Sequence, residues 1–598
     1  MRHLSVPILL LLLHALPAIG QSRSVKPAGQ QARQAPARQA PARQAPARQA
    51  PNLTALQAAV RARPNDPRAH HALGVALATK GQYGPAIEEL KQAVSLDAAF
   101  IEAWGDLAAA YEQKGDFQQA QQTYSRAVEL DPKNADLHIS LGSLLHRLQL
   151  LDAAAGEFRY AAQLRPDAAE IRTNLGFVLG QLGDLKGSLQ EFEAAVRLKP
   201  DLAEAHYFLG LGRMMSEDLD NGILSLRQAS QLKPGEVDNQ TSLAVALMKR
   251  ARRDDLNEAV LVLRRAVQLK PKVPEILTTY GVALRETGQF ESAASVLKQA
   301  IQLKPSLIEA HNNLGLVHLQ LKDYQAAVAE FQESMRIDPQ NHAARLNLGL
   351  TLTQRGDLAG AIREYEKLIE SNSDSTDLSN LIDAHYNLAL TLRRGDNRQR
   401  ALEVLRKCHS LQPDFADAWF TEGEIEYQQA NFDQALTALR TAISLRPTDG
   451  EYRYVAGNVL LRKGEIDQAI EEYRTAIRLA PGSHEMHNSL GAALRQKGDL
   501  QSARLEMQEA ARLLKLKQDQ EAAATAISVG QQRLKEGRLA DALTQFETST
   551  RLAPQMAEGW FYLSLTLSRK GQLAESRKIL TRAIQLDPNI ERRLGGKP

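Results

Sequence analysis

A 34-residue period constrains the fold of this chain more than any other feature of its sequence. Residues 310–339, AHNNLGLVHLQLKDYQAAVAEFQESMRIDP, place small residues at fixed points in two helix-like stretches and end at a proline. The same pattern returns at 99–132 and at 557–588. Because self-similarity at a fixed period marks a repeat architecture, we expect each copy to be one small element that packs on the next.

The copies account for most of the chain. Fifteen of them fill residues 67–590 if three extra residues lie in the sixth copy, six follow the ninth and five follow the thirteenth. Their starts are residues 67, 101, 135, 169, 203, 237, 274, 308, 342, 382, 416, 450, 484, 523 and 557. At 598 residues the chain is too long for one compact core, and only 5% of it is aromatic. We therefore expect a stack of short helices packed through small and aliphatic side chains.

Four positions in each repeat unit carry the physical signal. Position 8 is Gly, Ala or Ser in every unit and position 20 is equally small, which predicts close contact between two helices. Gly at position 15, as in Gly81 and Gly115, supplies the left-handed residue that ends the first helix, helix A. Proline at position 32, as in Pro132 and Pro200, ends the second helix, helix B, at the junction with the next unit.

These marks resemble the tetratricopeptide repeat. In the second unit the matching residues are Trp104, Leu107, Ala108, Tyr111, Ala120, Tyr124, Ala127 and Pro132. The resemblance covers almost the whole chain beyond residue 66 and implies an all-α fold, a right-handed α-solenoid superhelix of about fifteen helix-turn-helix units. In that family the helix A faces line a concave groove. The resemblance therefore implies protein or peptide ligands held in the groove, with stability arising from stacked neighbours.

Departures from the pattern suggest boundaries within the stack. A capping helix is expected at 52–66, a polar insertion at 376–381 and a helical connector without proline at 518–522. The insertion lies in the polar sequence SNSDSTDLSN, where we expect a bend or hinge. The predicted segments are residues 67–375 (units 1–9), 382–517 (units 10–13), 523–590 (units 14–15) and a C-terminal tail at 591–598.

The N-terminal sequence predicts export. Residues 1–20 combine one Arg, a leucine-rich run and the small-x-small end Ala18-Ile19-Gly20, which is typical of a secretory signal peptide. Retention of this segment as a membrane anchor stays open. Residues 21–51 contain a repeated QAPAR unit and predict an extended, disordered tether. We expect no transmembrane segment after signal removal, and a periplasmic or extracellular protein without an internal disulfide, because Cys408 is the only cysteine.

The sequence contains no recognisable catalytic or metal-binding motif, so we expect neither an enzyme nor a cofactor. Six histidines share position 4, namely His70, His138, His206, His311, His385 and His487. No two lie in neighbouring units, so we assign them to helix packing and not to a metal. Glu88, Glu89, Glu471 and Glu472 are expected to be solvated surface carboxylates. The run Lys249–Arg253 is expected to be a solvated turn.

Asparagine at position 6 is the one signal that points to a ligand. Asn313, Asn347 and Asn387 occupy it in three successive units, and Asn174 occupies it in the fourth. An amide both donates and accepts, so such a ladder suits the backbone of an extended peptide. The arrangement resembles the repeat arm of O-linked N-acetylglucosamine transferases, and we expect no catalytic domain of that kind here. The alternative is that Asn is simply common at this position.

Three classes of function follow from these observations. The first is an exported, non-enzymatic scaffold that binds proteins or extended peptides and helps to assemble a cell-envelope or extracellular complex. The second is a recognition arm for a separate enzyme, such as a glycosyltransferase or a polysaccharide-export machine. The third, nucleic-acid or glycan binding, is disfavoured because 73 basic and 70 acidic residues nearly balance, so no nucleic-acid partner is expected.

Overall fold

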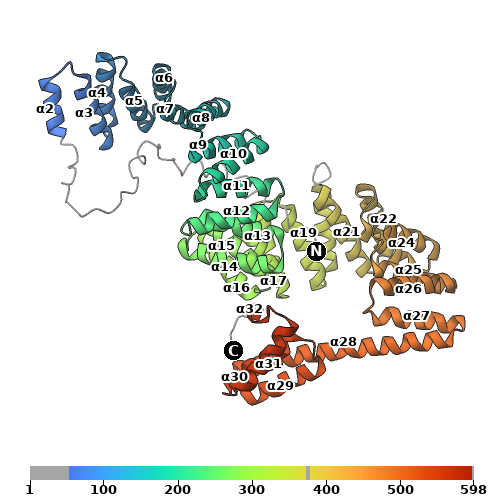
Figure 1. The fold of residues 1–598 in the computed structure, drawn as a ribbon. Helices are drawn as coiled ribbons and strands as arrows, with labels where there is room; N and C mark the ends of the chain where they lie inside the picture. Colours follow the sequence, from blue (N-terminus) through green and yellow to red (C-terminus); the bar gives the residue numbers. More distant parts are fainter. Residues whose placement is uncertain (1–52, 372–377, 595–598) are drawn as a thin grey trace. The chain divides into compact units, whose positions relative to one another are not determined.

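The computed structural model describes residues 53–371 and 378–594 (Figure 1). The predicted signal peptide at 1–20 and the tether at 21–51 lie outside the described residues. The described residues form helices joined by short turns, with no strand among them, so the all-α fold is confirmed. The chain divides between Pro339 and Gln340 into two compact segments, each of which is described separately.

The N-terminal segment is a run of paired helices. Their bounds are α2 (Leu53–Ala62), α3 (Pro67–Thr79), α4 (Tyr83–Leu96), α5 (Ile101–Lys114), α6 (Phe117–Leu130), α7 (Ala135–Arg147), α8 (Leu151–Leu164), α9 (Ala169–Gln181), α10 (Leu185–Leu198), α11 (Ala203–Met215), α12 (Leu219–Leu232), α13 (Val237–Arg250), α14 (Arg253–Leu269), α15 (Pro274–Glu286), α16 (Phe290–Leu303), α17 (Ile308–Gln320) and α18 (Tyr324–Ile337).

The C-terminal segment continues the same pattern. Its helices are α19 (His342–Arg355), α20 (Leu358–Ser371), α21 (Leu378–Arg394), α22 (Arg398–Leu411), α23 (Ala416–Gln428), α24 (Phe432–Leu445), α25 (Gly450–Lys463), α26 (Ile466–Leu479), α27 (His484–Lys497), α28 (Leu500–Lys535), α29 (Leu539–Leu552), α30 (Ala557–Arg569), α31 (Leu573–Leu586) and α32 (Ile590–Leu594). In both segments each helix A packs on the helix B that follows it.

Small residues at position 8 make room for the large side chain at position 24 of the same unit. A Cβ added to Gly349 would lie 2.5 Å from Cε1 of Tyr365, and one added to Gly457 would lie 2.6 Å from Cε1 of Tyr473. Both tyrosines are fully buried. The sequence rule at position 8 is therefore a packing rule within the unit, because any larger side chain would displace a core aromatic ring.

Position 15 is left-handed in every unit, whether or not it is glycine. Nine units have Gly there, with φ between 75° and 93°. The other six have the non-glycine residues Gln149, Glu217, Ala251, Lys322, Asp396 and Ala430, with φ between 57° and 63°. The turn between helices A and B thus fixes the backbone even where the side chain disfavours it.

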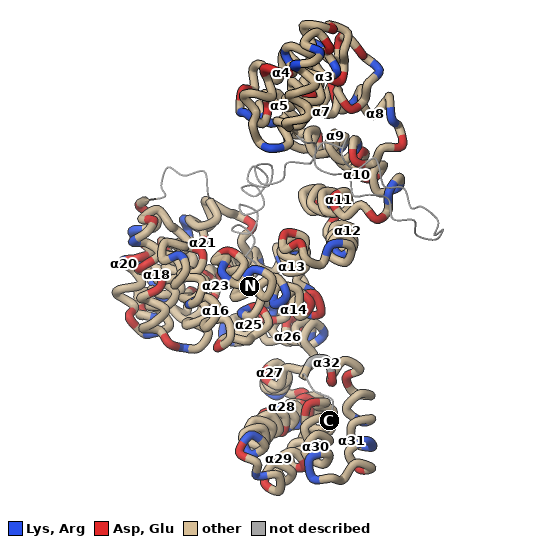
Figure 2. Tube along the Cα trace, turned by 90° about the vertical axis from the view of Figure 1, so that its left-hand side faces the viewer, with Lys and Arg blue, Asp and Glu red and all other residues tan. Residues whose placement is uncertain are grey.

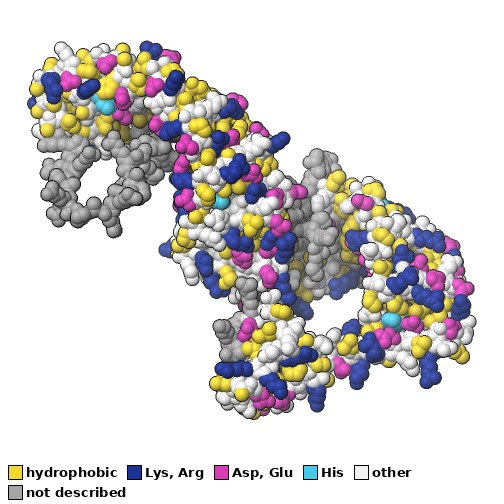
Figure 3. Space-filling view, viewed as in Figure 1, with side chains coloured by type: hydrophobic (Ala, Val, Ile, Leu, Met, Phe, Trp, Pro, Cys, Tyr) yellow, Lys and Arg dark blue, Asp and Glu magenta, His cyan; other side chains and the backbone are white. Residues whose placement is uncertain are grey.

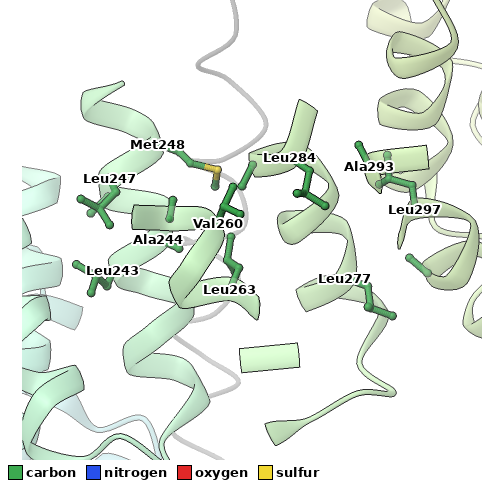
Figure 4. Close-up of a cluster of buried hydrophobic side chains, with 14 of the residues drawn as sticks. Leu243, Ala244, Leu247, Met248, Val260, Leu263, Leu277, Leu284, Ala293 and Leu297 are labelled. Carbon is green, nitrogen blue, oxygen red and sulfur yellow. The ribbon is translucent and has the colours of Figure 1, made fainter. Parts of the chain in front are cut away.

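One core cluster of the N-terminal segment extends through several neighbouring units, from Tyr207 to Val317. Figure 4 shows Leu243 and Leu247 of α13 beside Val260 and Leu263 of α14, with Leu277 of α15 next in line. Each helix pair buries one apolar face against its partner and another against the next pair. Stability therefore arises from contacts within units and from contacts between neighbouring units.

The stack is interrupted at α28, a single helix of 36 residues that serves as helix B of the thirteenth unit and helix A of the fourteenth (Figure 1). Residues 518–522, the expected connector, lie inside it. Positions 3 and 10 are buried in every other described unit, whereas here they are the exposed residues Thr525 and Gln532. A hollow of about 410 Å³ opens beside Leu500 and Met507, where the next helix A would otherwise pack.

Two further elements extend beyond the expected boundaries. Helix α21 begins at Leu378, inside the predicted insertion, and Leu381 and Ile382 are buried there. Residues 372–377 lie outside the described part of the chain. At the C-terminus, α32 occupies the start of the predicted tail, because Ile590 is fully buried against Ala557 and Phe561.

Candidate functional site

The described residues offer little to catalysis. No group of three or more His, Cys, Asp or Glu side chains among them is placed to hold a metal ion. Cys408 is buried, and this burial raises the pKa of its thiol to about 12, so the nucleophilic thiolate is suppressed. Acidic and basic residues are interspersed along the chain and on the visible face (Figures 2 and 3).

Three of the six position 4 histidines join helix A both to helix B and to the residues that precede the unit. In His70, Nδ1 lies 2.7 Å from Oε2 of Glu89 and Nε2 lies 3.0 Å from the carbonyl oxygen of Pro64, which belongs to the preceding unit. His138 and His311 have the same two contacts. The assignment of these histidines to helix packing is therefore correct, but the packing is polar.

Two of the carboxylates expected to be solvated have structural partners. Glu89 accepts a hydrogen bond from His70, and Glu472 accepts one from Arg453 at 3.0 Å. The prediction of a solvated surface is wrong for these two, because position 23 of helix B faces position 4 of helix A. A histidine or arginine followed 19 residues later by glutamate was the sequence signal that could have identified these pairs.

The basic run at Lys249–Arg253 is also less solvated than expected. Arg250 forms a bidentate pair with the buried carboxylate of Asp255, at 2.8 and 2.6 Å, and also contacts Asp220. The Arg250 guanidinium lowers the pKa of the Asp255 carboxyl. The Arg250–Asp255 pair therefore stabilises the turn at the three-residue insertion of the sixth unit.

Position 6 lies where neighbouring A helices meet, and in several units its side chain is already occupied. Each of these residues contacts the residue at position 5 of the preceding unit. The pairs are Asp106 with His71 at 2.7 Å, Ser242 with Tyr207 at 3.4 Å, Thr421 with Tyr386 at 3.3 Å and Ser489 with Tyr454 at 3.3 Å. These contacts use the hydrogen-bonding capacity of position 6 inside the stack.

The four candidate asparagines differ in how they are occupied. Asn313 accepts from Arg285 at 2.9 Å and donates to the carbonyl of Glu309 at 2.7 Å, so both ends of its amide are engaged. Asn387 donates to the carbonyl of Asp383 at 2.8 Å, which leaves its Oδ1 open. Asn174 and Asn347 make no side-chain hydrogen bond to another described residue. All four are half-buried.

Asn347 and Asn387 lie on neighbouring helices of the C-terminal segment. Helices α19 and α21 are joined by a hydrogen bond between the Thr353 and Thr391 hydroxyls, 3.0 Å apart. Three residues after each asparagine comes a half-buried leucine, Leu350 or Leu390. Because residues three apart share a helix face, each helix presents an amide beside an aliphatic side chain. We call Asn347, Leu350, Asn387 and Leu390 the ladder face.

The preceding unit explains why the amide oxygen of Asn387 is open. Position 5 of the ninth unit, which would contact Asn387, is Leu346, and leucine has no hydrogen-bonding group. In the tenth unit the same position is Tyr386, which occupies Thr421. The sequence search identified the asparagines from their repetition alone, and missed that a side chain of the preceding unit can occupy position 6, from position 5 in four units and from Arg285 in the case of Asn313.

Comparison with protein families agrees with this repeat geometry. Models described as tetratricopeptide repeat match residues 53–99, 386–450, 454–520 and 530–589, residues 77–145 and 318–384, and residues 169–202; a model described as TPR repeat matches 281–322. The chain belongs to the tetratricopeptide repeat (TPR) family. A search of curated proteins found no match to this TPR chain.

The chain is similar to several solved structures, at low identity and low TM-score. One is YrrB, titled a TPR protein with an unusual peptide-binding site, at 21% identity and a TM-score of 0.29, covering 34% of this chain and 100% of that one. Another is the APC/C hetero-tetramer Cut9-Hcn1, at 15% identity and a TM-score of 0.35, and the match covers 82% of this chain and 95% of that one. A third is Naa15/Naa10 bound to HypK-THB, at 16% identity and a TM-score of 0.27, and the match covers 88% of this chain and 95% of that one.

Between residues 53 and 594, leaving aside 372–377, no helix is both long and apolar enough to cross a bilayer.

Proposed function

We propose that this TPR chain is a non-enzymatic scaffold that binds extended segments of other proteins, and that the ladder face is one of its binding surfaces. The observation that carries the proposal is the pair Asn347 and Asn387, two amides on adjacent helices whose Oδ1 atoms have no partner among the described residues. An unpaired amide oxygen is well suited to accept a backbone N–H from a ligand.

The geometry favours a particular mode of recognition. One hydrogen of Nδ2 of Asn387 is held by the carbonyl of Asp383, and the Oδ1 atom is placed to accept a backbone N–H group from a ligand. Leu350 and Leu390 offer aliphatic contact beside each amide. The ligand class that fits is an extended peptide with free backbone N–H groups and aliphatic side chains between them.

The experiment begins with selection of linear peptides from a displayed random library on the full chain. The affinity of a selected peptide is then measured for wild type, for Asn347→Ala/Asn387→Ala and for the matched control Thr421→Ala/Ser489→Ala. Loss of two to four hydrogen bonds should weaken binding by about 10- to 100-fold in the asparagine variant only. Equal affinity for all three proteins would overturn the ladder face as the site.

A second arm tests backbone recognition. The selected peptide is resynthesised with single N-methyl groups, which remove one backbone donor each without changing a side chain. Loss of binding at two positions, and tolerance elsewhere, is the expected result. Uniform tolerance would show that the asparagines do not accept from the ligand backbone.

Export is part of the same proposal and rests on residues 1–20. Mass spectrometry of the protein recovered from the source cells should find a mature N-terminus near Gln21, outside the cytoplasm. A cytoplasmic chain that retains Met1 would contradict export and would leave the peptide-binding proposal standing.

A further inference from the structure

Three histidines lie between two acceptors at junctions of the N-terminal segment. For His311, Nδ1 is 2.7 Å from Oε2 of Glu330 and Nε2 is 3.0 Å from the carbonyl oxygen of Pro305. The corresponding distances are 2.7 and 3.0 Å for His70 and 2.6 and 2.9 Å for His138. The three rings are 5–7% exposed.

The chemistry of the partners dictates the charge of the ring. A carboxylate and a carbonyl oxygen only accept hydrogen bonds, so both ring nitrogens must donate to satisfy them. A neutral imidazole has one N–H and one lone pair, and the lone pair would then face an acceptor oxygen. Only the imidazolium, with two N–H groups, completes both bonds.

Other units make the same contact with side chains that do not titrate near neutrality. Trp104, Trp419 and Trp560 donate to the corresponding carbonyl at 2.9–3.0 Å. Arg172 contacts both the Pro166 carbonyl and Glu191. In these units position 4 is a clamp that joins helix A to the residues preceding the unit, and His70, His138, His311 and Arg172 also join it to helix B of their own unit.

We propose that His70, His138 and His311 are imidazolium clamps, and that rising pH loosens the junctions they hold while leaving the tryptophan and arginine junctions unchanged. Each loosened junction loses either the bond to its own helix B or the bond to the preceding unit. The chain thus contains pH-sensitive joints at the starts of the first, third and eighth units.

The surroundings of His311 set the direction of the effect. Glu330 and Glu333 face it from α18, and the hydrogen bond to Glu330 raises the pKa of His311 above 6.5. Such a group stabilises the fold below pH 6.5, and this contribution disappears as pH rises through the higher folded-state value. His318 on the same helix, near Lys298 and Asp323, has a lowered pKa through burial and acts with the opposite sign.

The test compares the full chain with a triple variant, His70→Arg/His138→Arg/His311→Arg, which copies the Arg172–Glu191 arrangement. Amide hydrogen exchange is followed by mass spectrometry at pH 6.0 and pH 8.5, and each rate is divided by the intrinsic rate of that amide. In wild type, protection of α3, α7 and α17 should fall about threefold or more between the two values. In the arginine variant this fall should be absent.

The matched control is His206→Gln. His206 contacts only the Pro200 carbonyl, at 2.9 Å, and Ser225 lies where the units of the three clamps have glutamate. This control should retain the pH dependence at the three clamps. Equal pH dependence in wild type and in the arginine variant would overturn the proposal, as would a midpoint for C2–H exchange of His311 at or below 6.5.

Discussion

Two neighbouring regions of the C-terminal segment use the same repeat position in opposite ways. On α23 and α27, the position 6 hydroxyls of Thr421 and Ser489 are held by Tyr386 and Tyr454 of the preceding units. On α19 and α21, the amides of Asn347 and Asn387 have an open acceptor. We call the first, which runs from α23 to α27, the tied region and contrast it with the ladder face.

The difference shows that a polar side chain at one repeat position can serve either the stack or a ligand. A hydrogen bond between neighbouring A helices stabilises the stack but removes that group from any ligand. Leu346, at position 5 of the unit before Asn387, has no hydrogen-bonding group, so the Asn387 amide oxygen remains available. The availability of Asn387 to a ligand therefore depends on Leu346 of the preceding unit, and not on the identity of position 6 alone.

The largest effect is expected from packing that both regions share. Gly349→Val and Gly457→Val would each drive a β-branched side chain into a buried tyrosine, Tyr365 or Tyr473, at a cost of about 2–3 kcal/mol. Local amide exchange should rise equally in the ladder and tied regions. A markedly smaller cost at Gly349 would mean that the ladder unit is already loosely packed.

The next test converts one region into the other. Leu346→Tyr/Asn387→Thr reproduces the Tyr386–Thr421 arrangement at the ladder face, so affinity for the selected peptide should fall about tenfold while the protein stays folded. Circular dichroism and titration with the peptide give the two readouts. Unchanged affinity would argue that Asn387 does not contact the ligand.

A smaller effect separates structural hydroxyls from free amides. Tyr386→Phe and Tyr454→Phe each remove an inter-unit hydrogen bond and should cost about 0.5–1.5 kcal/mol in denaturant unfolding. Asn347→Ala, which removes no side-chain hydrogen bond to a described residue, should change stability by less than about 0.5 kcal/mol. If Asn347→Ala is as costly as the tyrosine substitutions, the asparagine is a structural residue.

The smallest expected effect concerns the left-handed residue between helices A and B. Ala430 in the tied region has φ of 62°, whereas Gly356 in the ladder unit has φ of 92°. Ala430→Gly should stabilise by about 0.5–1 kcal/mol and Gly356→Ala should destabilise by a similar amount. Thermal unfolding compares the unfolding temperature of each variant with that of wild type. If both variants shift this temperature in the same direction, this account of position 15 is contradicted.

The sequence predicted what depends on local periodicity. Small residues at positions 8 and 20 and the turn at position 15 follow from steric rules that each unit obeys alone, so the repeat fold was predictable. Contacts between helices were harder to predict, because the pairing of His70 with Glu89 needs the packing of helix A on helix B to bring residues 19 apart together. The open amide of Asn387 was beyond reach for the same reason, since it depends on Leu346 of the preceding unit.

The most direct test of the central claim is to place a photocrosslinking amino acid at the same repeat position in each region. Leu350 in the ladder unit and Asn458 in the tied region both occupy position 9. With the selected peptide bound, the probe at 350 should crosslink to it and the probe at 458 should not. Crosslinking at 458 alone, or equally at both, would contradict the ladder face as the site of peptide binding.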